Sequence, residues 1–253
     1  MNWHIIRAGI VAAGLLVQVV SAAAADIKVY STVAFQGVLE QLAPQFEKAS
    51  GNKLAITYGL AAQLVQRVQA GETADVLILT RAGIDALIKD GKIAPGSDVM
   101  LAGAGTAVVV KVGALKPDIS SPEALKRALL AAKSITYGDP ASGGASGVYF
   151  GKLLERLGIA EQMKSKTKFP PSGKLSADVL VAGDAELGVM QTSELIPGTE
   201  LVGTLPGDLN NVTVFGTGLE TNSKEASAGA ALIKFLQSRE AAAVYKAKGL
   251  DPS

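Results

Sequence analysis

Apolar residues along the chain alternate between two spacings. Short apolar runs of strand length separate stretches in which apolar residues recur every three or four positions; the runs predict strands and the stretches predict helices. In the first third, strands are predicted at 27–30, 53–58 and 74–79, and helices at 35–49, 63–70 and 81–89. This alternation predicts βαβ units and a parallel sheet, and the nearly all-apolar run at 74–79 suits a sheet that is covered on both faces.

The same alternation continues to the end of the chain. The run at 103–112 has the strongest strand pattern, and Ser121 followed by Pro122 is typical of a helix N-terminus. Further strands are predicted to start at Ile135 and to span 187–190 and 211–219, with helices at 145–157, 173–181, 224–237 and 239–248.

Two of the predicted strands connect separate parts of the chain. The strand at 103–112 leads into a second lobe, and the strand at 211–219 returns to the first. We therefore expect an α/β fold of two Rossmann-like lobes with two crossings, in which lobe I comprises 26–105 and 216–253 and lobe II comprises 106–215. Such lobes leave a central cleft that strand ends and helix N-termini face, which indicates a ligand.

A turn rich in glycine and serine precedes the predicted helix at 145–157. Backbone N–H groups are unpaired at a helix N-terminus, and the helix macrodipole adds about half a positive charge there. Together with Gly143, Gly144 and the hydroxyl groups of Ser142 and Ser146, the turn predicts an anion pocket. The alternative is a tight strand-to-helix connection whose glycines only serve the backbone geometry.

The first 25 residues have the layout of a secretory signal peptide. Arg7 precedes an apolar run at 8–20, and small residues lead to plausible cleavage positions after Ala24 or Ala25. The apolar run is shorter than the roughly 20 residues that a membrane span needs. No cysteine follows that could carry a lipid anchor, so we expect a soluble protein in a bacterial periplasm.

Composition removes several kinds of chemistry. The chain has no cysteine, and its one histidine, His4, lies in the predicted signal peptide. Disulfides, thiolate metal sites, cysteine nucleophiles, histidine-ligated zinc and Ser-His-Asp catalysis are therefore excluded for the mature chain. Beyond residue 25, basic and acidic residues balance at 23 each, so no overall charge favours nucleic acid as a partner. We expect no metal and no cofactor.

Short motifs that span the mature chain in order carry a resemblance to a known family. They lie at 27–30, 46–51, 69–76, 138–140, 147–149, 157–158, 187–189, 235–238 and 243–250. The chain resembles the periplasmic molybdate-binding proteins of ABC transporters, including a branch that contains aconitate isomerase. The resemblance implies the type II periplasmic binding-protein fold, an anion in the cleft and a membrane permease as partner.

The chain departs from this family where the family binds its ligand. A serine of the family corresponds to Ala34, a serine run corresponds to 59–62, which has no hydroxyl group, and a tyrosine corresponds to Gln191. Each lost hydrogen-bond donor costs about 1–3 kcal/mol. We therefore expect that molybdate itself is not the ligand.

Arg81 stands at the end of a predicted strand, in the segment 79–81, where the family usually has Ser-Ala-Asp. Its guanidinium group offers a planar fork for a carboxylate, which suits an organic anion; the alternative is a surface arginine at a helix start. Ser31 and Thr32 are ambiguous because they can instead cap the following helix. The expected ligand-binding residues are Ser31, Thr32, Thr80, Arg81, Ser142, Gly143, Gly144, Ser146, Lys174 and Gln191.

Two functions fit this sequence. The first is a monomeric receptor that binds a small oxyanion or organic carboxylate and presents it to an ABC permease. The second is a cofactor-independent isomerase of a tricarboxylate, resembling aconitate isomerase, and we rank it lower. In an enzyme without histidine, the base would have to be Lys174, Tyr149 or Asp139, although Asp139 can simply form a turn and Tyr149 can simply pack on its helix.

Overall fold

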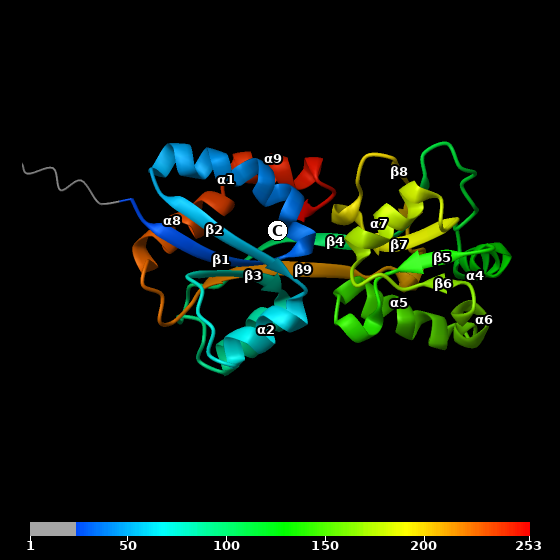
Figure 1. The fold of residues 1–253 in the computed structure, drawn as a ribbon, viewed down its shortest axis with the longest axis horizontal. Coiled ribbons are helices and arrows are strands. Elements are labelled where there is room, and N and C mark those ends of the chain that lie inside the picture. Colours follow the sequence, from blue (N-terminus) through cyan, green and yellow to red (C-terminus); the bar gives the residue numbers. More distant parts are fainter. Residues whose placement is uncertain (1–23) are drawn as a thin grey trace, which may run out of the picture.

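The structure is a computed structural model that describes residues 24–253. Residues 1–23 of the predicted signal peptide lie outside the described residues. The chain forms two lobes that lie side by side, with two long strands running between them (Figure 1).

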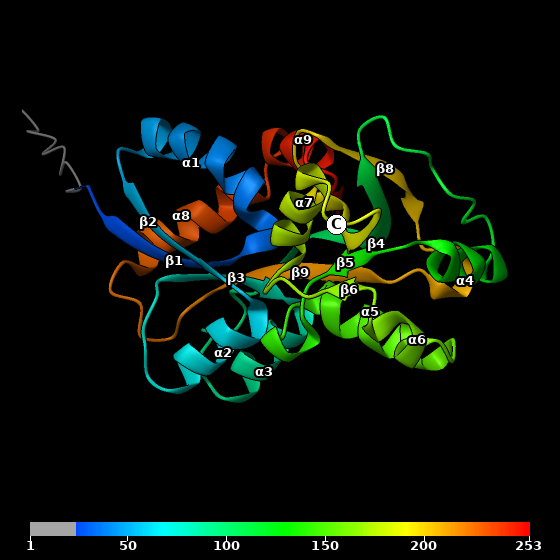
Figure 2. The same ribbon diagram turned by 45° about the vertical axis from the view of Figure 1, so that its right-hand side comes forward.

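Lobe I contains three parallel strands, with β1 (Asp26–Thr32) between β2 (Lys53–Gly59) and β3 (Val76–Thr80). Helices α1 (Gln36–Ser50), α2 (Ala61–Gln69) and α3 (Arg81–Lys89) follow the three strands in turn, and α1 is preceded by the 3-10 turn η1 (Val33–Phe35). The C-terminal helices α8 (Ala226–Leu236) and α9 (Arg239–Ala247) return to this lobe and pack beside α1 (Figure 2).

Strands β4 (Val99–Lys111) and β9 (Val212–Leu219) connect the lobes. The first part of β4 pairs antiparallel with β9, and its second part, from Thr106, pairs with β7 (Leu187–Gln191) and β8 (Thr199–Thr204) of lobe II. Strand β9 also pairs antiparallel with β3, so the sheet order is β2-β1-β3-β9-β4-β7-β5-β6. One continuous strand therefore belongs to the sheets of both lobes.

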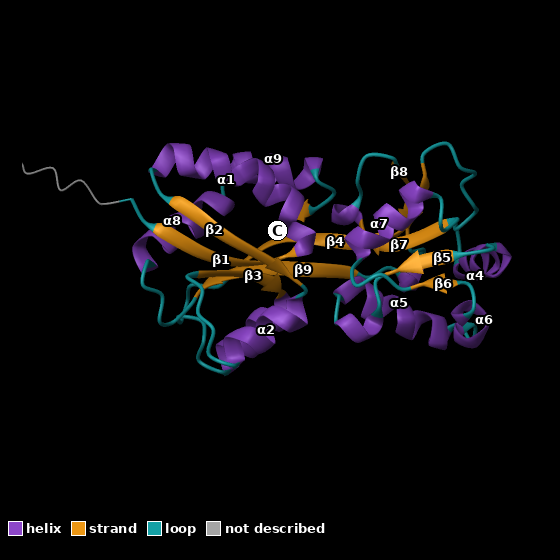
Figure 3. Cartoon of the chain, in the orientation of Figure 1, coloured by secondary structure: helices purple, strands orange, loops and turns teal. Residues whose placement is uncertain are grey.

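Lobe II repeats the parallel arrangement around β5 (Ile135–Tyr137), which lies between β7 and the short β6 (Thr167–Lys168). Its helices are α4 (Pro122–Ala131), α5 (Ala145–Arg156), α6 (Ala160–Lys164) and α7 (Gly173–Ala182). Figure 3 shows that helices cover the strands of this lobe on both sides. Ser121 caps α4, because its hydroxyl group accepts a hydrogen bond of 3.1 Å from the Ala124 N–H.

Each lobe has its own hydrophobic core. In lobe I, Phe35 of η1 is fully buried and makes edge-on ring contacts with Phe215 and Tyr245, at centroid distances of 5.4 and 5.6 Å. In lobe II, Phe150 of α5 packs edge-on against Tyr137 at 4.9 Å. These contacts hold η1 and α5 against their sheets, and both elements border the space between the lobes.

The predicted order of helices and strands is confirmed, with two kinds of difference. The sheet is mixed rather than purely parallel, because β4 and β9 run antiparallel to their neighbours. The sequence pattern also did not predict α6, β6, β8 and the C-terminal β10 (Asp251–Pro252), which are short or lack a continuous apolar run. The exact lobe boundaries expected at 105/106 and 215/216 stay predictions.

Truncation of Leu39 will test the packing of α1 on the sheet of lobe I. Leu39 is 1% exposed, so Leu39→Ala should lower the free energy of unfolding by about 2–5 kcal/mol through lost burial and a new cavity. Leu115→Ala is the matched control: Leu115 is 95% exposed, and its truncation should change stability by less than about 0.5 kcal/mol. Urea denaturation followed by circular dichroism measures both; equal losses would contradict the packing described above.

Candidate functional site

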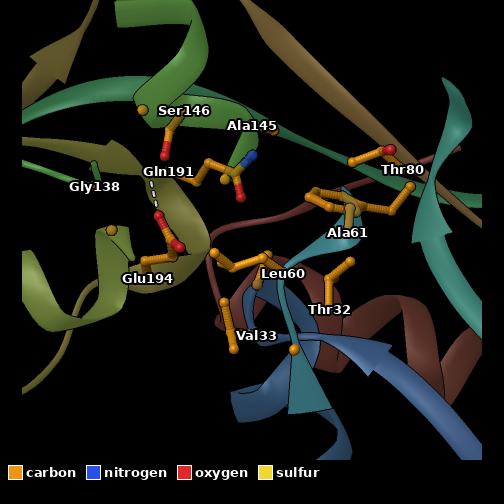
Figure 4. A pocket seen from close by; sticks show the side chains of 16 residues that line it. Thr32, Val33, Leu60, Ala61, Thr80, Gly138, Ala145, Ser146, Gln191 and Glu194 are labelled. Atoms are coloured by element: carbon orange, nitrogen blue, oxygen red, sulfur yellow. Dashed lines mark hydrogen bonds between the residues drawn. The ribbon is translucent and has the colours of Figure 1, made fainter. Parts of the chain in front are cut away.

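A small cavity lies between the lobes and is lined by residues of both. Figure 4 shows Ser146, Gln191 and Glu194 of lobe II on one side and Thr32, Val33, Leu60, Ala61 and Thr80 of lobe I on the other. The cavity volume is about 20 Å³, which is room for about one water molecule. The two lobes are therefore closed on each other at this cavity, and a wider groove lies beside it between α2 and α3 of lobe I and α5 of lobe II.

Direct contacts between the lobes accompany this closed arrangement. The Thr192 hydroxyl donates a hydrogen bond of 2.5 Å to the carbonyl oxygen of Gly249, which follows α9 of lobe I. Gly249 has a φ of 75°, in the left-handed region, and a Cβ there would collide with the Thr192 carbonyl group. Only glycine combines this backbone conformation with so close an approach.

Helix N-termini from both lobes converge on the cavity. The lining includes Leu60 and Thr80, which are the N-caps of α2 and α3, Gly144, which is the N-cap of α5, and Gly173, the first residue of α7. Each of these helices has nine or more residues, and each presents backbone N–H groups and the positive end of its dipole at the cavity. The arrangement favours negative charge in the cavity.

Neutral polar side chains complete the lining. Ser146 and Gln191 are buried, and the Thr80 hydroxyl oxygen accepts a bond of 3.2 Å from the Gly83 N–H, which leaves its own proton free to donate. Thr32 precedes η1 but makes no capping bond with its side chain. The hydroxyl group of Thr32 and the amide nitrogen of Gln191 are buried without a hydrogen-bond partner, so a bound ligand would satisfy groups that are costly to leave unpaired.

Glu194 is the one charged residue among the described residues that line the cavity. It is 6% exposed and lies in the 3-10 turn η3 (Thr192–Glu194), directly after β7. One carboxylate oxygen accepts a hydrogen bond of 2.9 Å from the Gln191 N–H, which makes Glu194 part of a capping box.

Glycine residues bring the elements of lobe II together at this carboxylate. A Cβ on Gly173 would collide with the Glu194 carboxylate, and a Cβ on Gly147 would collide with the Gly138 carbonyl oxygen. The first turn of α7 therefore lies directly against Glu194, and the first turn of α5 lies directly against the end of β5. These close approaches require residues without a side chain at both positions.

Burial raises the pKa of Glu194 from its ordinary value of 4.5 to about 7. Desolvation of the charged form is the main cause. Hydrogen bonds from the backbone N–H groups of Gln191 and Lys174, the positive charge of Lys174 and the Ser146 hydroxyl lower the pKa, but they do not offset the desolvation. This carboxyl group can therefore gain or lose a proton near neutral pH, which suits it for proton transfer.

The structure brings half of the expected ligand-binding residues to the cavity. Those that line it are Thr32, Thr80, Gly144, Ser146 and Gln191. Those that do not line it are Ser31, Arg81, Ser142, Gly143 and Lys174. The assignment of all ten as ligand contacts stays a prediction.

The residues outside the lining have other contacts. Ser31 donates a hydrogen bond to the Thr32 carbonyl oxygen, and the Ser142 carbonyl oxygen accepts one from Gln63 of lobe I at 3.5 Å. Gly143 lies against the Ala62 side chain. The loop that contains Ser142 and Gly143 thus contacts α2 of the other lobe, whereas Ser146, one helical turn further on, faces the cavity.

Arg81 occupies the first position of α3, and its side chain extends along the helix surface to Asp85. Its Nε lies 2.8 Å from a carboxylate oxygen of Asp85, and both side chains are about half exposed. The carboxylate that Arg81 contacts is thus on its own helix. This is the i,i+4 geometry in which exposed ion pairs commonly form.

The three expected bases also lie outside the cavity lining. Asp139 accepts a bond of 2.9 Å from the Ala141 N–H and forms a turn, and the Tyr149 hydroxyl donates to the Leu209 carbonyl oxygen at 2.9 Å. Lys174 contributes its backbone N–H and its charge to the surroundings of Glu194. Within residues 24–253, no group of three or more histidine, cysteine or acidic side chains is placed to hold a metal ion.

Glu194 was not predicted from the sequence as a residue of the site. A partial signal was present, because Glu194 follows the apolar run at 187–190 by a few residues and stands three positions after Gln191, as a capping box requires. The burial of Glu194 could not be predicted from the sequence, because Glu194 is buried by Gly173 and Ser146, which are distant from it in the sequence.

Comparison with protein families bears on this two-lobed site. Residues 27–251 match the family described as bacterial extracellular solute-binding protein. The chain belongs to this family. The match covers both lobes and every element that lines the cavity.

Two curated relatives carry different functional names. Aconitate isomerase from a Pseudomonas species is 33% identical over 89% of this chain and 87% of its own length. The molybdate-binding protein ModA of Azotobacter vinelandii is 27% identical over 95% of each chain. Relatives of this chain therefore include a binding protein and an enzyme.

A solved structure supports the fold. The periplasmic molybdate-binding protein of Azotobacter vinelandii superposes with a TM-score of 0.70 at 20% identity and covers 88% of this chain and 98% of its own. The expected fold class, an α/β type II periplasmic binding protein with two lobes and a central cleft, is confirmed. None of the helices in the described part, residues 24–253, has the length and apolar character to cross a membrane.

The buried carboxyl group of Glu194 should make stability depend on pH. Its folded-state pKa is above its unfolded value, so the wild type should lose stability as the pH rises from about 4.5 through about 7. Glu194→Gln cannot ionise, so its stability relative to the wild type should improve by on the order of 3 kcal/mol between pH 4.5 and pH 8.

Urea denaturation at several pH values measures this difference. Glu155→Gln is the control, because Glu155 is an exposed residue of α5, and its stability relative to the wild type should stay nearly constant. A difference between Glu194→Gln and wild type that is the same at pH 4.5 and pH 8 would refute the raised pKa.

Proposed function

We propose that this protein is the receptor of an ABC importer and that it binds a small anion between its lobes. Membership of the solute-binding family supports the receptor part. The observation that most supports an anionic ligand is that the N-termini of α2, α3, α5 and α7 converge on one cavity. A helix N-terminus typically stabilises a negative charge by about 0.3–1 kcal/mol, and a buried cavity brings several of them to the same ligand.

The proposed ligand is an organic anion with at least one carboxylate. Ala34, Gly59, Leu60 and Ala61 border the cavity without hydroxyl groups, so lobe I has few side-chain donors for a compact oxyanion. Lobe II instead offers the Gln191 amide nitrogen, which has no partner, beside the N-termini of α5 and α7, and these N–H donors suit the two oxygens of a carboxylate. This agrees with our expectation that molybdate is not the ligand.

Such a ligand requires the lobes to separate first. It is larger than the room of about one water molecule that the closed cavity has. Strands β4 and β9 are the two connections about which the lobes would open, with the change of pairing partner at Thr106 as the proposed hinge. The closed form would be the one that a permease recognises.

The location follows from the same proposal. We propose that residues 1–25 are a cleaved secretory signal peptide and that the mature chain acts as a soluble monomer in the periplasm. Lobe I is proposed to comprise 26–105 with 216–253, and lobe II 106–215. The separate hydrophobic cores of the two lobes support this division except at Phe215, which packs in the core of lobe I.

Isothermal titration with a panel of anions will test the receptor function. The panel comprises molybdate, tungstate, sulfate, trans-aconitate, citrate and succinate, and we expect a carboxylate to bind most tightly. Ser146→Ala removes a buried donor from the cavity and should weaken that binding about 5- to 150-fold, equivalent to about 1–3 kcal/mol. Ser227→Ala, an exposed position on α8, is the matched control and should bind like the wild type. The proposal fails if no anion of the panel binds.

A second candidate function is the isomerisation of a tricarboxylate on the same scaffold. Two observations favour it: the 33% identity to aconitate isomerase over 89% of the chain, and a carboxyl group in the cavity that can exchange a proton near neutral pH. In this reaction, a base removes a proton from the methylene carbon of aconitate, the double bond shifts, and a proton is added to the former alkene carbon. Glu194 is the side chain we propose for this transfer.

Incubation of the protein with trans-aconitate in D₂O, followed by proton NMR, separates the two functions. An isomerase forms cis-aconitate that carries deuterium at the newly protonated carbon, and Glu194→Gln should lower the rate at least about 100-fold. Ser227→Ala should keep the wild-type rate. Binding of trans-aconitate without conversion would leave the receptor as the function and remove the enzyme for this substrate.

A further inference from the structure

The cavity combines two features that conflict if Glu194 is ionised. Four helix N-termini and several neutral donors make it attractive to an anion. Its one charged lining residue, within the described part of the chain, is an acid. No basic side chain lines the cavity in this part of the chain, so nothing in the lining neutralises a second negative charge.

Two adjacent negative charges are costly in such a place. Glu194 is 6% exposed, and the closed cavity has room for about one water molecule, so water screens little. When two anionic groups share a dry site, one of them is normally protonated. A fully ionised ligand cannot supply that proton, so Glu194 must hold it.

We infer that the cavity binds its anion together with one proton, which resides on Glu194. The neutral carboxyl group then has an O–H that can donate a hydrogen bond to the ligand, while its other oxygen keeps the bond from the Gln191 N–H. The inference rests on the proposed function, because it assumes that an anion binds in this cavity. It adds that binding responds to pH near neutrality.

The groups around Glu194 do not remove the conflict. From α7, Lys174 acts on the carboxyl group through its charge and its backbone N–H; from α5 comes only the Ser146 hydroxyl, and from β7 only the Gln191 N–H. The Lys174 side chain is outside the cavity lining. Even with the positive charge of Lys174 nearby, the pKa of Glu194 is raised to about 7.

The direction of the pH dependence follows from linkage. In the free protein Glu194 is protonated below about pH 7, and a nearby anion raises its pKa further. Below about pH 6, the proton is present before and after binding, so affinity should be constant. Above about pH 7, binding must take up a proton, so the dissociation constant should rise about tenfold per pH unit until the pKa of the complex is reached.

Titration calorimetry of the wild type tests the inference with trans-aconitate and molybdate, which are both fully ionised at pH 8. At pH 8, titrations in HEPES, triethanolamine and Tris separate proton uptake from binding, because the buffers release protons with different enthalpies. We expect uptake of about one proton per bound anion at pH 8 and less than about 0.2 at pH 5.5. Uptake near zero at pH 8 would overturn the inference.

Glu194→Gln supplies the second measurement. The amide resembles the protonated acid in shape but cannot ionise, so the variant should show no proton uptake at pH 8 and an affinity that changes by less than about threefold between pH 6 and pH 8. Glu155→Gln should keep the wild-type pH profile. If Glu194→Gln retains that profile, the proton resides elsewhere and the inference is wrong.

The outcomes also distinguish this inference from the proposed function. Binding without proton uptake overturns the inference and leaves the receptor function intact. If neither probe binds between pH 5.5 and 8.5, and the other anions of the panel also fail, the anion-receptor function fails, and the inference fails with it.

Discussion

The pairing of β4 with strands of both lobes is the constraint on which the rest of this structure depends. Its first part, 99–105, pairs with β9 in lobe I, and its continuation from Thr106 pairs with β7 and β8 in lobe II. The backbone hydrogen bonds of a single strand thus fix the two sheets relative to each other. Because helices α2, α3, α5 and α7 follow strands of those sheets, their N-termini meet at one place.

This meeting place is suited to negative charge without a basic residue in the described lining. Backbone N–H groups, helix dipoles and neutral side chains provide the attraction, and the Thr32 hydroxyl and the Gln191 amide have no other partner. Such groups are preorganised by the fold, so they lose little entropy when a ligand binds. The buried acid Glu194 differs from them in kind, since its charge depends on pH. A site of this composition can hold an anion, exchange a proton, or do both.

The relatives of this chain show why the distinction between binding and catalysis depends on single residues. A molybdate-binding protein and an aconitate isomerase both align with nearly the whole chain. The fold is therefore compatible with either function, and function must be argued from the residues that line the cavity. Ala34 and Gln191 differ from the molybdate-binding pattern, and Glu194 adds a group that can transfer protons near neutral pH.

The sequence by itself determined the order and type of the main elements, because periodicity and capping residues such as Ser121 act locally. It also indicated the helix N-terminus at Ser146. Only the tertiary structure decided which donors face one cavity: Ser146 does, whereas Ser142 contacts α2 and Arg81 pairs with Asp85. The state of Glu194 was decided in the same way, since its desolvation arises from packing against Gly173 and Ser146, which long-range strand pairing brings to it.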